Sequence, residues 1–433
     1  MTGSDVAESP VVRRLRERGI TVVIGHRREH VPRNCDLVVY SPAIPPTNPE
    51  LLAAQANGIR HMSLPEALGW LMRDRVGVAV AGTHGKSTTT ALLGEILSQG
   101  GLDPTVIVGA VVPAWSASAR AGRGPIVVAE ACEYARSFLA LRPRIAAVLN
   151  VDLDHMDYYP NLRTLYRAYT EFLRLLPEEG YALVADAPEV RRLAEGVRCV
   201  VETFGDKVSS DWRYEIVQTA RGRSRFRVYH RGRFLAEARS GLIGVHNVAN
   251  VVAAVALASR VGVPVKRAVR CSETFRPCAR RLEFVGYRNG VAHYDDYAHH
   301  PAAVRESLKA IRAEAGSGPL WCVFQPHQLW RAVQLGAEFA EALCHADGIV
   351  LLPVYPARER ASAAACALAA RRIARLCRQR CRRVYFAPTV EAAALIVERV
   401  VPPGGAVVTM GAGDVWKVRD AVFAGPGTRR QAG

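Results

Sequence analysis

One short stretch of the chain combines the residue types that hold nucleotide phosphates. It consists of Gly82, Thr83, His84, Gly85, Lys86, Ser87 and Thr88. Glycines let successive backbone N–H groups turn toward phosphate oxygens, a lysine can reach the outer phosphates, and a serine hydroxyl can bind Mg²⁺. The strict pattern requires a glycine at position 80, where this chain has Val80. We interpret the stretch as a shortened phosphate-binding loop, against the alternative of a structural glycine turn.

Carboxylates and a histidine follow two further predicted strands, at residues 126–129 and 145–149. Glu130 ends the first strand. The second strand runs into a cluster of four such side chains: Asp152, Asp154, His155 and Asp157. Because the carboxyl ends of strands border the ligand crevice of an open α/β sheet, we expect Glu130 to bind Mg²⁺ together with Ser87, and His155 to bind a second cation. The alternatives are a solvated Glu130 and a helix N-cap by Asp154 or Asp157.

Four more polar residues lie at helix starts, strand ends or unit boundaries. Asn247 and Asn250 are three apart, so they share one face of the first turn of a predicted helix. There they can contact a phosphate or an adenine, although a helix cap by Asn247 is the alternative. Arg281 falls between two predicted units, where an arginine can clamp a phosphate across a cleft, although an arginine pair by itself carries no signal in so arginine-rich a chain. Asp296 lies in a strand-end loop with a second aspartate and two histidines, more than a helix cap needs.

The elements that must position these residues indicate an α/β fold. The run 76–80 predicts a buried strand and residues 91–97 an amphipathic helix, which gives the loop the strand–loop–helix context it requires. Residues 212–238 predict antiparallel hairpins. We expect four segments: 1–73, 74–277, 278–424 and a disordered tail at 425–433. A doubly wound nucleotide-type domain opens with a strand and a glycine turn, and we expect the first unit to lack both.

Composition narrows the class of protein. Of the 57 basic residues 52 are arginines, spread along the chain, so the net charge of +17 indicates codon bias more than nucleic-acid binding. The densest arginine cluster, 371–383, and the pair Cys377 and Cys381 fall on one predicted helix. The ten cysteines lack a Cys-x-x-Cys spacing, which favours reduced, mostly buried thiols. With neither a signal peptide nor a membrane-spanning apolar run, we expect a cytoplasmic protein without membrane insertion or nucleic-acid partner.

Taken in order along the chain, these stretches resemble the Mur ligase family. The resemblance covers roughly residues 3–420 and is carried by 82–89, 130–139, 154–159, 244–250, 280–283, 295–301, 324–327 and 411–417. It implies three α/β domains: an N-terminal Rossmann-like domain for a UDP-sugar, here truncated, a central P-loop ATPase domain, and a C-terminal Rossmann-like domain for the amino acid.

The resemblance also implies a reaction. With ATP and Mg²⁺ as cofactors, L-alanine would be joined to the lactyl carboxylate of UDP-N-acetylmuramate through an acyl phosphate, in peptidoglycan precursor synthesis. The implied catalytic residues are Lys86, Glu130, His155, Asn247, Asn250, Arg281 and Asp296. By the same resemblance, Ser87, Glu130 and His155 would bind Mg²⁺. His327 and Arg331 resemble positions near the amino acid.

Two alternatives to this reaction stay open. One is the ligase that recycles murein tripeptide onto the same sugar, and the other is an ATP-binding remnant without a sugar site. Several sister ligases carry a carbamylated lysine downstream of the Asp-His-x-Asp motif. This chain has no lysine between Lys86 and Lys207, which favours the alanine-adding branch.

Overall fold

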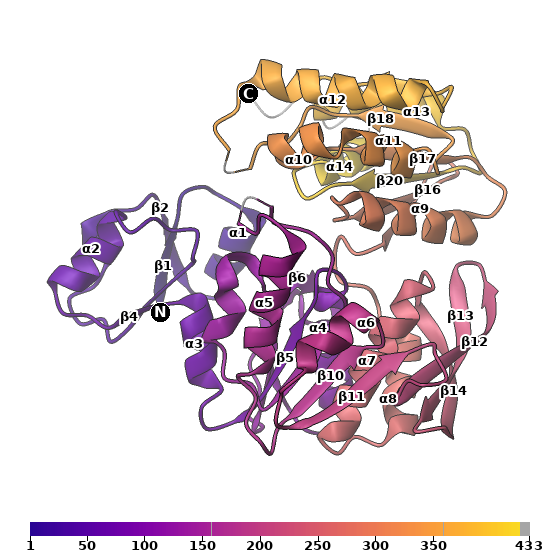
Figure 1. The fold of residues 1–433 in the computed structure, drawn as a ribbon. Coiled ribbons are helices and arrows are strands. Elements are labelled where there is room, and N and C mark those ends of the chain that lie inside the picture. Colours follow the sequence, from indigo (N-terminus) through magenta and orange to yellow (C-terminus); the bar gives the residue numbers. More distant parts are fainter. Residues whose placement is uncertain (157, 358, 425–433) are drawn as a thin grey trace.

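Three groups of strands and helices follow one another along the chain (Figure 1). The computed structural model describes residues 1–156, 158–357 and 359–424. The expected α/β fold class is confirmed, because parallel strands alternate with helices in all three groups. In Figure 1 the N-terminal unit lies on one side of the central unit, and the C-terminal unit lies above the central unit.

The N-terminal unit contains four short strands in two separate pairs. Its elements are β1 (Thr2–Asp5), α1 (Pro10–Glu17), β2 (Thr21–Ile24), η1 (Arg28–His30), β3 (Val38–Tyr40), α2 (Pro49–Ala56), β4 (His61–Ser63) and α3 (Leu64–Leu71). β1 pairs with β2 and β3 pairs with β4, both in parallel, and no hydrogen-bonded ladder joins the two pairs within the described residues.

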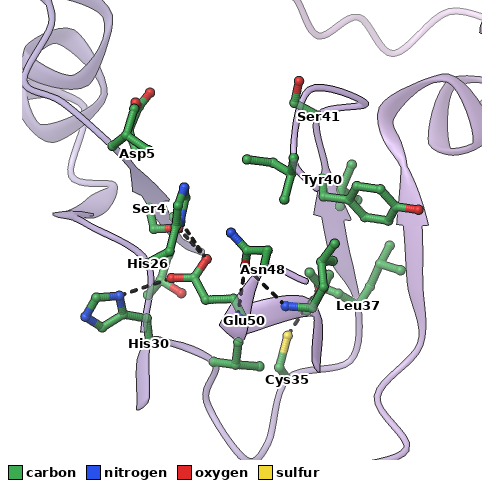
Figure 2. A pocket seen from close by; sticks show the side chains of 18 of the residues that line it. Ser4, Asp5, His26, His30, Cys35, Leu37, Tyr40, Ser41, Asn48 and Glu50 are labelled. Atoms are coloured by element: carbon green, nitrogen blue, oxygen red, sulfur yellow. Dashed lines mark hydrogen bonds and ion pairs between the residues drawn. The ribbon is translucent and has the colours of Figure 1, made fainter. Parts of the chain in front are cut away.

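A groove of about 480 Å³ separates these two pairs (Figure 2). Residues of β1 and β3 line its two sides. On its wall the carboxylate of Glu50 accepts a hydrogen bond from Ser4 Oγ at 2.6 Å. The Nδ1 atoms of His26 and His30 lie 3.2 and 3.1 Å from the same carboxylate. One glutamate of α2 therefore ties together β1 and the segment that follows β2.

The central unit is built on a ten-stranded mixed sheet. Its strands are β5 (Val76–Ala81), β6 (Thr105–Val112), β7 (Ala117–Arg120), β8 (Ile126–Glu130), β9 (Ile145–Val148), β10 (Tyr181–Ala185), β11 (Val200–Gly205), β12 (Trp212–Ala220), β13 (Arg223–His230) and β14 (Arg233–Ile243). Their order is β14-β13-β12-β11-β10-β9-β5-β8-β6-β7. The predicted hairpins are confirmed as β12, β13 and β14, which pair antiparallel.

Helices cover both faces of this sheet. They are α4 (Lys86–Gln99), η2 (Pro113–Trp115), η3 (Tyr134–Ala140), α5 (Leu162–Leu173), α6 (Pro188–Arg191), η4 (Arg192–Ala194), α7 (His246–Arg260) and α8 (Val265–Thr274). Along β5, Val78 and Val80 pack into the cluster that contains α4, α7 and α8, whereas Ala79 and Ala81 pack into the cluster that contains α5. A strand buried on both faces consists of consecutive apolar residues. β5 could therefore be predicted from the sequence.

The C-terminal unit is built on a six-stranded sheet of order β15-β16-β20-β17-β18-β19. Its strands are β15 (Glu283–Arg288), β16 (Val291–Asp296), β17 (Leu320–Phe324), β18 (Gly348–Leu351), β19 (Val384–Phe386) and β20 (Ala406–Met410). Its helices are α9 (Pro301–Ala315), α10 (Leu329–Gln334), α11 (Gly336–Leu343), α12 (Ala363–Arg378), α13 (Val390–Val400) and α14 (Trp416–Ala424). The boundaries predicted at 73/74 and 277/278 fall between α3 and β5 and between α8 and β15, and they stay predictions.

One expectation about the arginine-rich helix is wrong. α12 ends at Arg378, so Cys381, Arg382 and Arg383 lie in the connection between α12 and β19 (Val384–Phe386). All ten cysteines are free thiols, and six of them are buried. The tail predicted at 425–433 lies outside the described residues. Within the described ranges, no helix combines the length and the apolar character needed to cross a bilayer.

Candidate active site

The glycine-rich loop joins β5 to α4, as the sequence predicts. Gly85 stands at the N-cap of α4 with φ +82°, a left-handed conformation that side chains disfavour. A Cβ at this position would lie 2.3 Å from Oδ1 of Asn250. Glycine is therefore required here for two reasons, its backbone angle and the close approach of α7.

The segment after β9 holds this loop in place. The amide of Asn150 accepts from the backbone N–H of His84 at 2.8 Å and donates to the carbonyl of His84 at 3.0 Å. The hydroxyl of Thr83 accepts from the backbone N–H of Asp152 at 2.9 Å. Because β9 neighbours β5 in the sheet, these bonds fix the loop before any ligand arrives. Asn150 was missed by the sequence reasoning, although its place directly after a buried strand was a usable signal.

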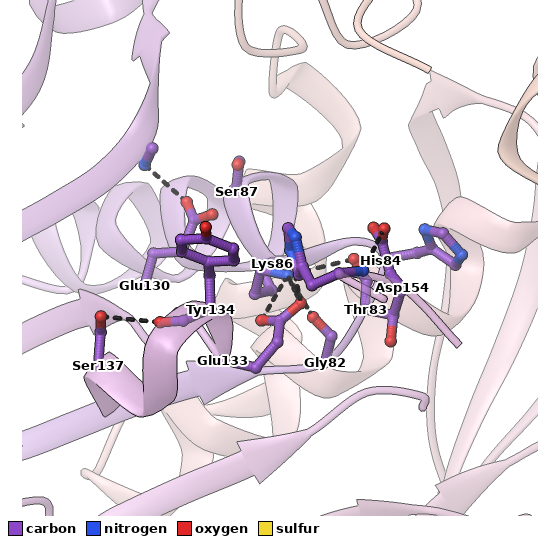
Figure 3. A network of polar contacts seen from close by, with 12 residues as sticks. Gly82, Thr83, His84, Lys86, Ser87, Glu130, Glu133, Tyr134, Ser137 and Asp154 are labelled. Carbon is purple, nitrogen blue, oxygen red and sulfur yellow. Dashed lines mark hydrogen bonds and ion pairs between the residues drawn. The ribbon is translucent and has the colours of Figure 1, made fainter. Parts of the chain in front are cut away.

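Lys86 points back into the loop rather than away from it (Figure 3). Its ammonium donates to the carbonyls of Gly82 at 2.5 Å and Thr83 at 3.2 Å, and to Glu133 Oε1 at 3.0 Å. Burial disfavours the charge on Lys86, but the nearby Glu133 carboxylate outweighs burial and raises the pKa of the ammonium. The sequence reasoning also missed Glu133. Its signal was a carboxylate three residues past Glu130, after the same strand.

The three predicted magnesium ligands each contact a different partner and do not form a closed cage. Ser87 Oγ accepts a hydrogen bond from Arg281 at 3.2 Å, and Glu130 Oε2 accepts one from the backbone N–H of Gly109 at 2.6 Å. His155 Nε2 lies 3.7 Å from a Glu133 oxygen. In the part of the chain that the structure describes, no three His, Cys, Asp or Glu side chains converge closely enough for a metal ion.

A magnesium ion that accompanies a triphosphate needs only one or two protein carboxylates, because phosphate oxygens and water complete its shell. A hydroxyl at Ser87, next to Lys86 in the chain, and a carboxylate at Glu130, close enough to act on the charge of Lys86, fit that requirement. The magnesium role of these residues and of His155 stays a prediction.

Asp154 takes part in an ion pair between two units and does not cap a helix. α5 begins at Leu162 with Asn161 as its N-cap, so the alternative of a cap by Asp154 is wrong, and Asp157 lies outside the described residues. Asp154 Oδ1 lies 2.5 Å from Nη2 of Arg331, and both residues are buried. Burial works against the charge on Asp154, but the Arg331 guanidinium holds the pKa of that carboxyl well below its usual range.

The asparagines of α7 lie against the phosphate loop. The N-cap of α7 is Val245, whose side chain makes no capping bond, so the alternative of a cap by Asn247 is wrong. Asn247 donates instead to the carbonyl of Ile243 at 2.7 Å and accepts from Asn250 at 2.9 Å. This pair orients Asn250 next to Gly85, which brings the first turn of α7 to the loop as expected.

Arg281 reaches the loop from the start of the C-terminal unit. In addition to its bond to Ser87, its guanidinium lies 4.8 Å from the ring centre of Tyr297. Asp296, at the end of β16, is buried and accepts a hydrogen bond from Ser307. Burial raises the pKa of Asp296, whereas Ser307 and the charge of Arg281 act in the opposite direction. The structure therefore brings Arg281 to the loop and places Asp296 within its electrostatic reach.

Three known family patterns match this chain in consecutive stretches. The pattern described as "Mur ligase family, catalytic domain" matches residues 1–76, "Mur ligase middle domain" matches 80–258, and "Mur ligase, glutamate ligase domain" matches 280–413. The chain belongs to the Mur ligase family. Its members are ATP-dependent ligases that form amide bonds.

Relatives and solved structures agree with this membership. A UDP-N-acetylmuramate–L-alanine ligase of Desulforamulus reducens is 36% identical over 418 residues, which cover 96% of this chain and 90% of the relative. A solved UDP-N-acetylmuramate–alanine ligase of Thermotoga maritima has the same fold, with a TM-score of 0.81, 24% identity, and coverage of 98% and 92% of the two chains. A solved murein peptide ligase of Psychrobacter arcticus has a TM-score of 0.71, 23% identity, and coverage of 98% and 92%.

In this Mur ligase the ends of adjacent C-terminal strands also meet, as their polar residues suggest. Gln325, after β17, donates to Asp414, after β20, at 2.9 Å. Arg280 donates to the carbonyl of Gly413 at 3.1 Å. His327 stacks on Tyr355 at 5.8 Å between ring centres, and burial lowers its pKa to about 4. The strand ends of the C-terminal unit thus form a polar rim on the side where Arg331 reaches Asp154.

Proposed function

We propose that this Mur ligase joins L-alanine to the lactyl carboxylate of UDP-N-acetylmuramate, with ATP as the second substrate. The observation that carries the proposal is the contact between Arg281 and Ser87. This contact places an arginine of the C-terminal unit on the phosphate loop of the central unit. A cleft closed in this way keeps water from an activated acyl group. The likeness to relatives with this name, over nearly the whole chain, supports the choice of substrates.

The reaction has two chemical steps. A lactyl carboxylate oxygen attacks the γ-phosphorus of ATP, and the bond to the β–γ bridging oxygen breaks, so that ADP leaves and an acyl phosphate remains. The uncharged amine of L-alanine then attacks the acyl carbon, loses a proton, and expels inorganic phosphate as the amide forms. The first step places negative charge on the phosphoryl oxygens, and the second places it on the acyl oxygen and the departing phosphate, so fixed cationic groups around them lower the barriers.

The residues of the loop supply these groups in the proposal. Lys86 contacts the outer phosphates, and Ser87, Glu130 and His155 hold Mg²⁺, which neutralises phosphate charge when bound. Asn247 and Asn250 lie near the nucleotide and hold the loop in place at Gly85. Arg281 and Asp296 contact the nucleotide from the C-terminal side of the cleft.

The amino acid would lie near Arg331 and His327. Arg331 is a buried guanidinium, the kind of group that binds a carboxylate in a defined orientation. His327 is held neutral by burial. In the proposal L-alanine therefore enters between α10 and the segment that carries Asp154, and the UDP-sugar lies with the N-terminal unit.

Phosphate release tests the proposal. We expect release that requires ATP, UDP-N-acetylmuramate and L-alanine together, and a loss of at least about a hundredfold in kcat for Lys86→Ala, because a cation on the transferring phosphoryl group is removed. Lys309→Ala, which removes an exposed lysine paired with Glu306, is the matched control. Release that depends on L-Ala-D-Glu-diaminopimelate instead of L-alanine would identify the recycling ligase. ATP binding without any release would identify the remnant.

A further inference from the structure

Glu133 is the most deeply enclosed carboxylate around the phosphate loop. The residue is 1% exposed and directly precedes η3, which follows the β8 strand. Its two oxygens both lie 3.0 Å from Nζ of Lys86. Its own backbone carbonyl accepts a hydrogen bond from the Tyr159 hydroxyl at 2.6 Å, which fixes the position of the main chain. The main chain of Glu133 is therefore fixed, and its buried carboxylate lies against Lys86.

The partners of Lys86 show what this carboxylate does to the loop. An ammonium has three protons, and here two go to the carbonyls of Gly82 and Thr83 and the third to Glu133. Lys86 thus has no proton left for a phosphate in the ligand-free loop. An incoming phosphate oxygen must replace one of these acceptors. Glu133 is the only carboxylate within ion-pair distance of Lys86 in the described part of the chain.

We propose that Glu133 is a positioning residue for Lys86. It competes with the phosphates for the ammonium in the ground state, and it holds Nζ at the base of the loop when the phosphoryl group is transferred. The expected effect on kcat rests on the proposed function. The expected effect on nucleotide binding requires only the ATP site of the family.

Two opposite effects on binding and on rate follow from this geometry. The Glu133 carboxylate occupies a proton of Lys86 that a polyphosphate would otherwise accept, so its removal leaves nucleotide binding unchanged or tighter. A lysine that is no longer anchored on its far side is less well aimed at the charge that develops during transfer, so kcat falls. Substitution of a residue that only stabilises the fold would lower the melting temperature. It would not lower kcat while leaving Kd unchanged or lower.

Calorimetric titration with β,γ-imido-ATP and MgCl₂ tests the binding effect. For Glu133→Gln we expect a Kd equal to that of the parent or up to about tenfold lower, whereas Lys86→Ala raises Kd. In the Lys86→Ala background, Glu133→Gln should change Kd less than about twofold, because the residue acts through Lys86. A Kd raised more than about threefold by Glu133→Gln alone overturns the proposal.

Steady-state kinetics test the second effect. We expect kcat of Glu133→Gln to fall at least about tenfold while KM for ATP does not rise, and Glu133→Asp to recover part of the rate because the charge is kept. Asp186→Asn is the matched control, since Asp186 is a buried, ion-paired carboxylate away from the loop. A kcat for Glu133→Gln within about twofold of the parent, or an equal loss in Asp186→Asn, overturns the proposal. If the parent releases no phosphate, the proposed function fails and the titration alone decides the role of Glu133.

Discussion

Three imidazole side chains of the C-terminal unit lose much of their contact with water on folding. Burial lowers the pKa of His293 to about 4, of His299 to about 3 and of His327 to about 4. For His293 burial is the only cause, because its ring packs edge-on against Phe423 and has no charged neighbour among the causes of its shift. These residues are therefore neutral at pH 7.

His293 makes stability depend on pH in a defined direction. Its folded-state pKa lies below its unfolded value of about 6.5, so its contribution is complete above pH 6.5 and is lost as pH falls toward 4. We expect His293→Leu to reduce the loss of unfolding free energy between pH 7 and pH 4 by about 2 kcal/mol. Calorimetric melts at several pH values measure this difference. The exposed His61→Leu is the control, and equal pH dependence in parent and His293→Leu would contradict the assignment.

Sequence reasoning at the residue scale was most useful where the pattern was local. Gly85, Lys86 and Ser87 follow one another along the chain, so their place between a strand and a helix could be predicted without a structure. The two pairs of partners that hold Lys86 and Asp154, Glu133 for Lys86 and Arg331 for Asp154, are separated by 47 and 177 positions. Sequence spacing carries no information about such pairs, because the sheet order and the contact between units determine them.

At the scale of elements, helix α3 joins the N-terminal unit to the central unit. It packs against η3, the segment that begins next to Glu133. A Cβ on Gly69, in the middle of α3, would lie 2.1 Å from the carbonyl oxygen of Ala140. Two backbones thus approach as closely as a glycine allows, and the position of η3 depends on this contact.

We expect Gly69→Ala to destabilise the protein by about 1–3 kcal/mol, because the backbone of η3 must move to accept a methyl group. The gain of about 1 kcal/mol that alanine brings to a helix interior is smaller than this cost. Urea denaturation measures the change. In Gly336→Ala, on α11, the new Cβ would meet side chains only at 3.7 Å and beyond, so that control should be neutral or stabilising. A stabilised Gly69→Ala would refute the close contact.

At the scale of the whole molecule, the buried pair of Arg331 and Asp154 ties the C-terminal unit to the central unit. Removal of one partner from a buried ion pair leaves an uncompensated charge, at a cost of roughly 3–5 kcal/mol. Within a cleft, that charge regains water if the two units separate. The pair therefore keeps the two units close together, in addition to stabilising each unit.

We expect Arg331→Met to increase the radius of gyration of the ligand-free protein in small-angle X-ray scattering, because Asp154 gains hydration when the cleft opens. Asp154→Asn should act in the same direction, since it leaves the buried Arg331 guanidinium without its carboxylate. Arg305→Met breaks a more exposed pair with Glu341 inside the C-terminal unit and serves as the control. Identical scattering from Arg331→Met and the parent would show that the pair does not hold the units together.

The separated strand pairs of the N-terminal unit have an energetic consequence of their own. Edge amides of β1 and β3 that no ladder protects exchange their hydrogens readily, and a unit with so few cross-strand bonds opens at a lower free energy than the ten-stranded sheet. By mass action, anything that binds across both pairs stabilises this unit in proportion to its affinity. A ligand bound in the groove between β1 and β3 would therefore slow hydrogen exchange in the N-terminal unit. The amides of this unit would then be as protected as those of the core.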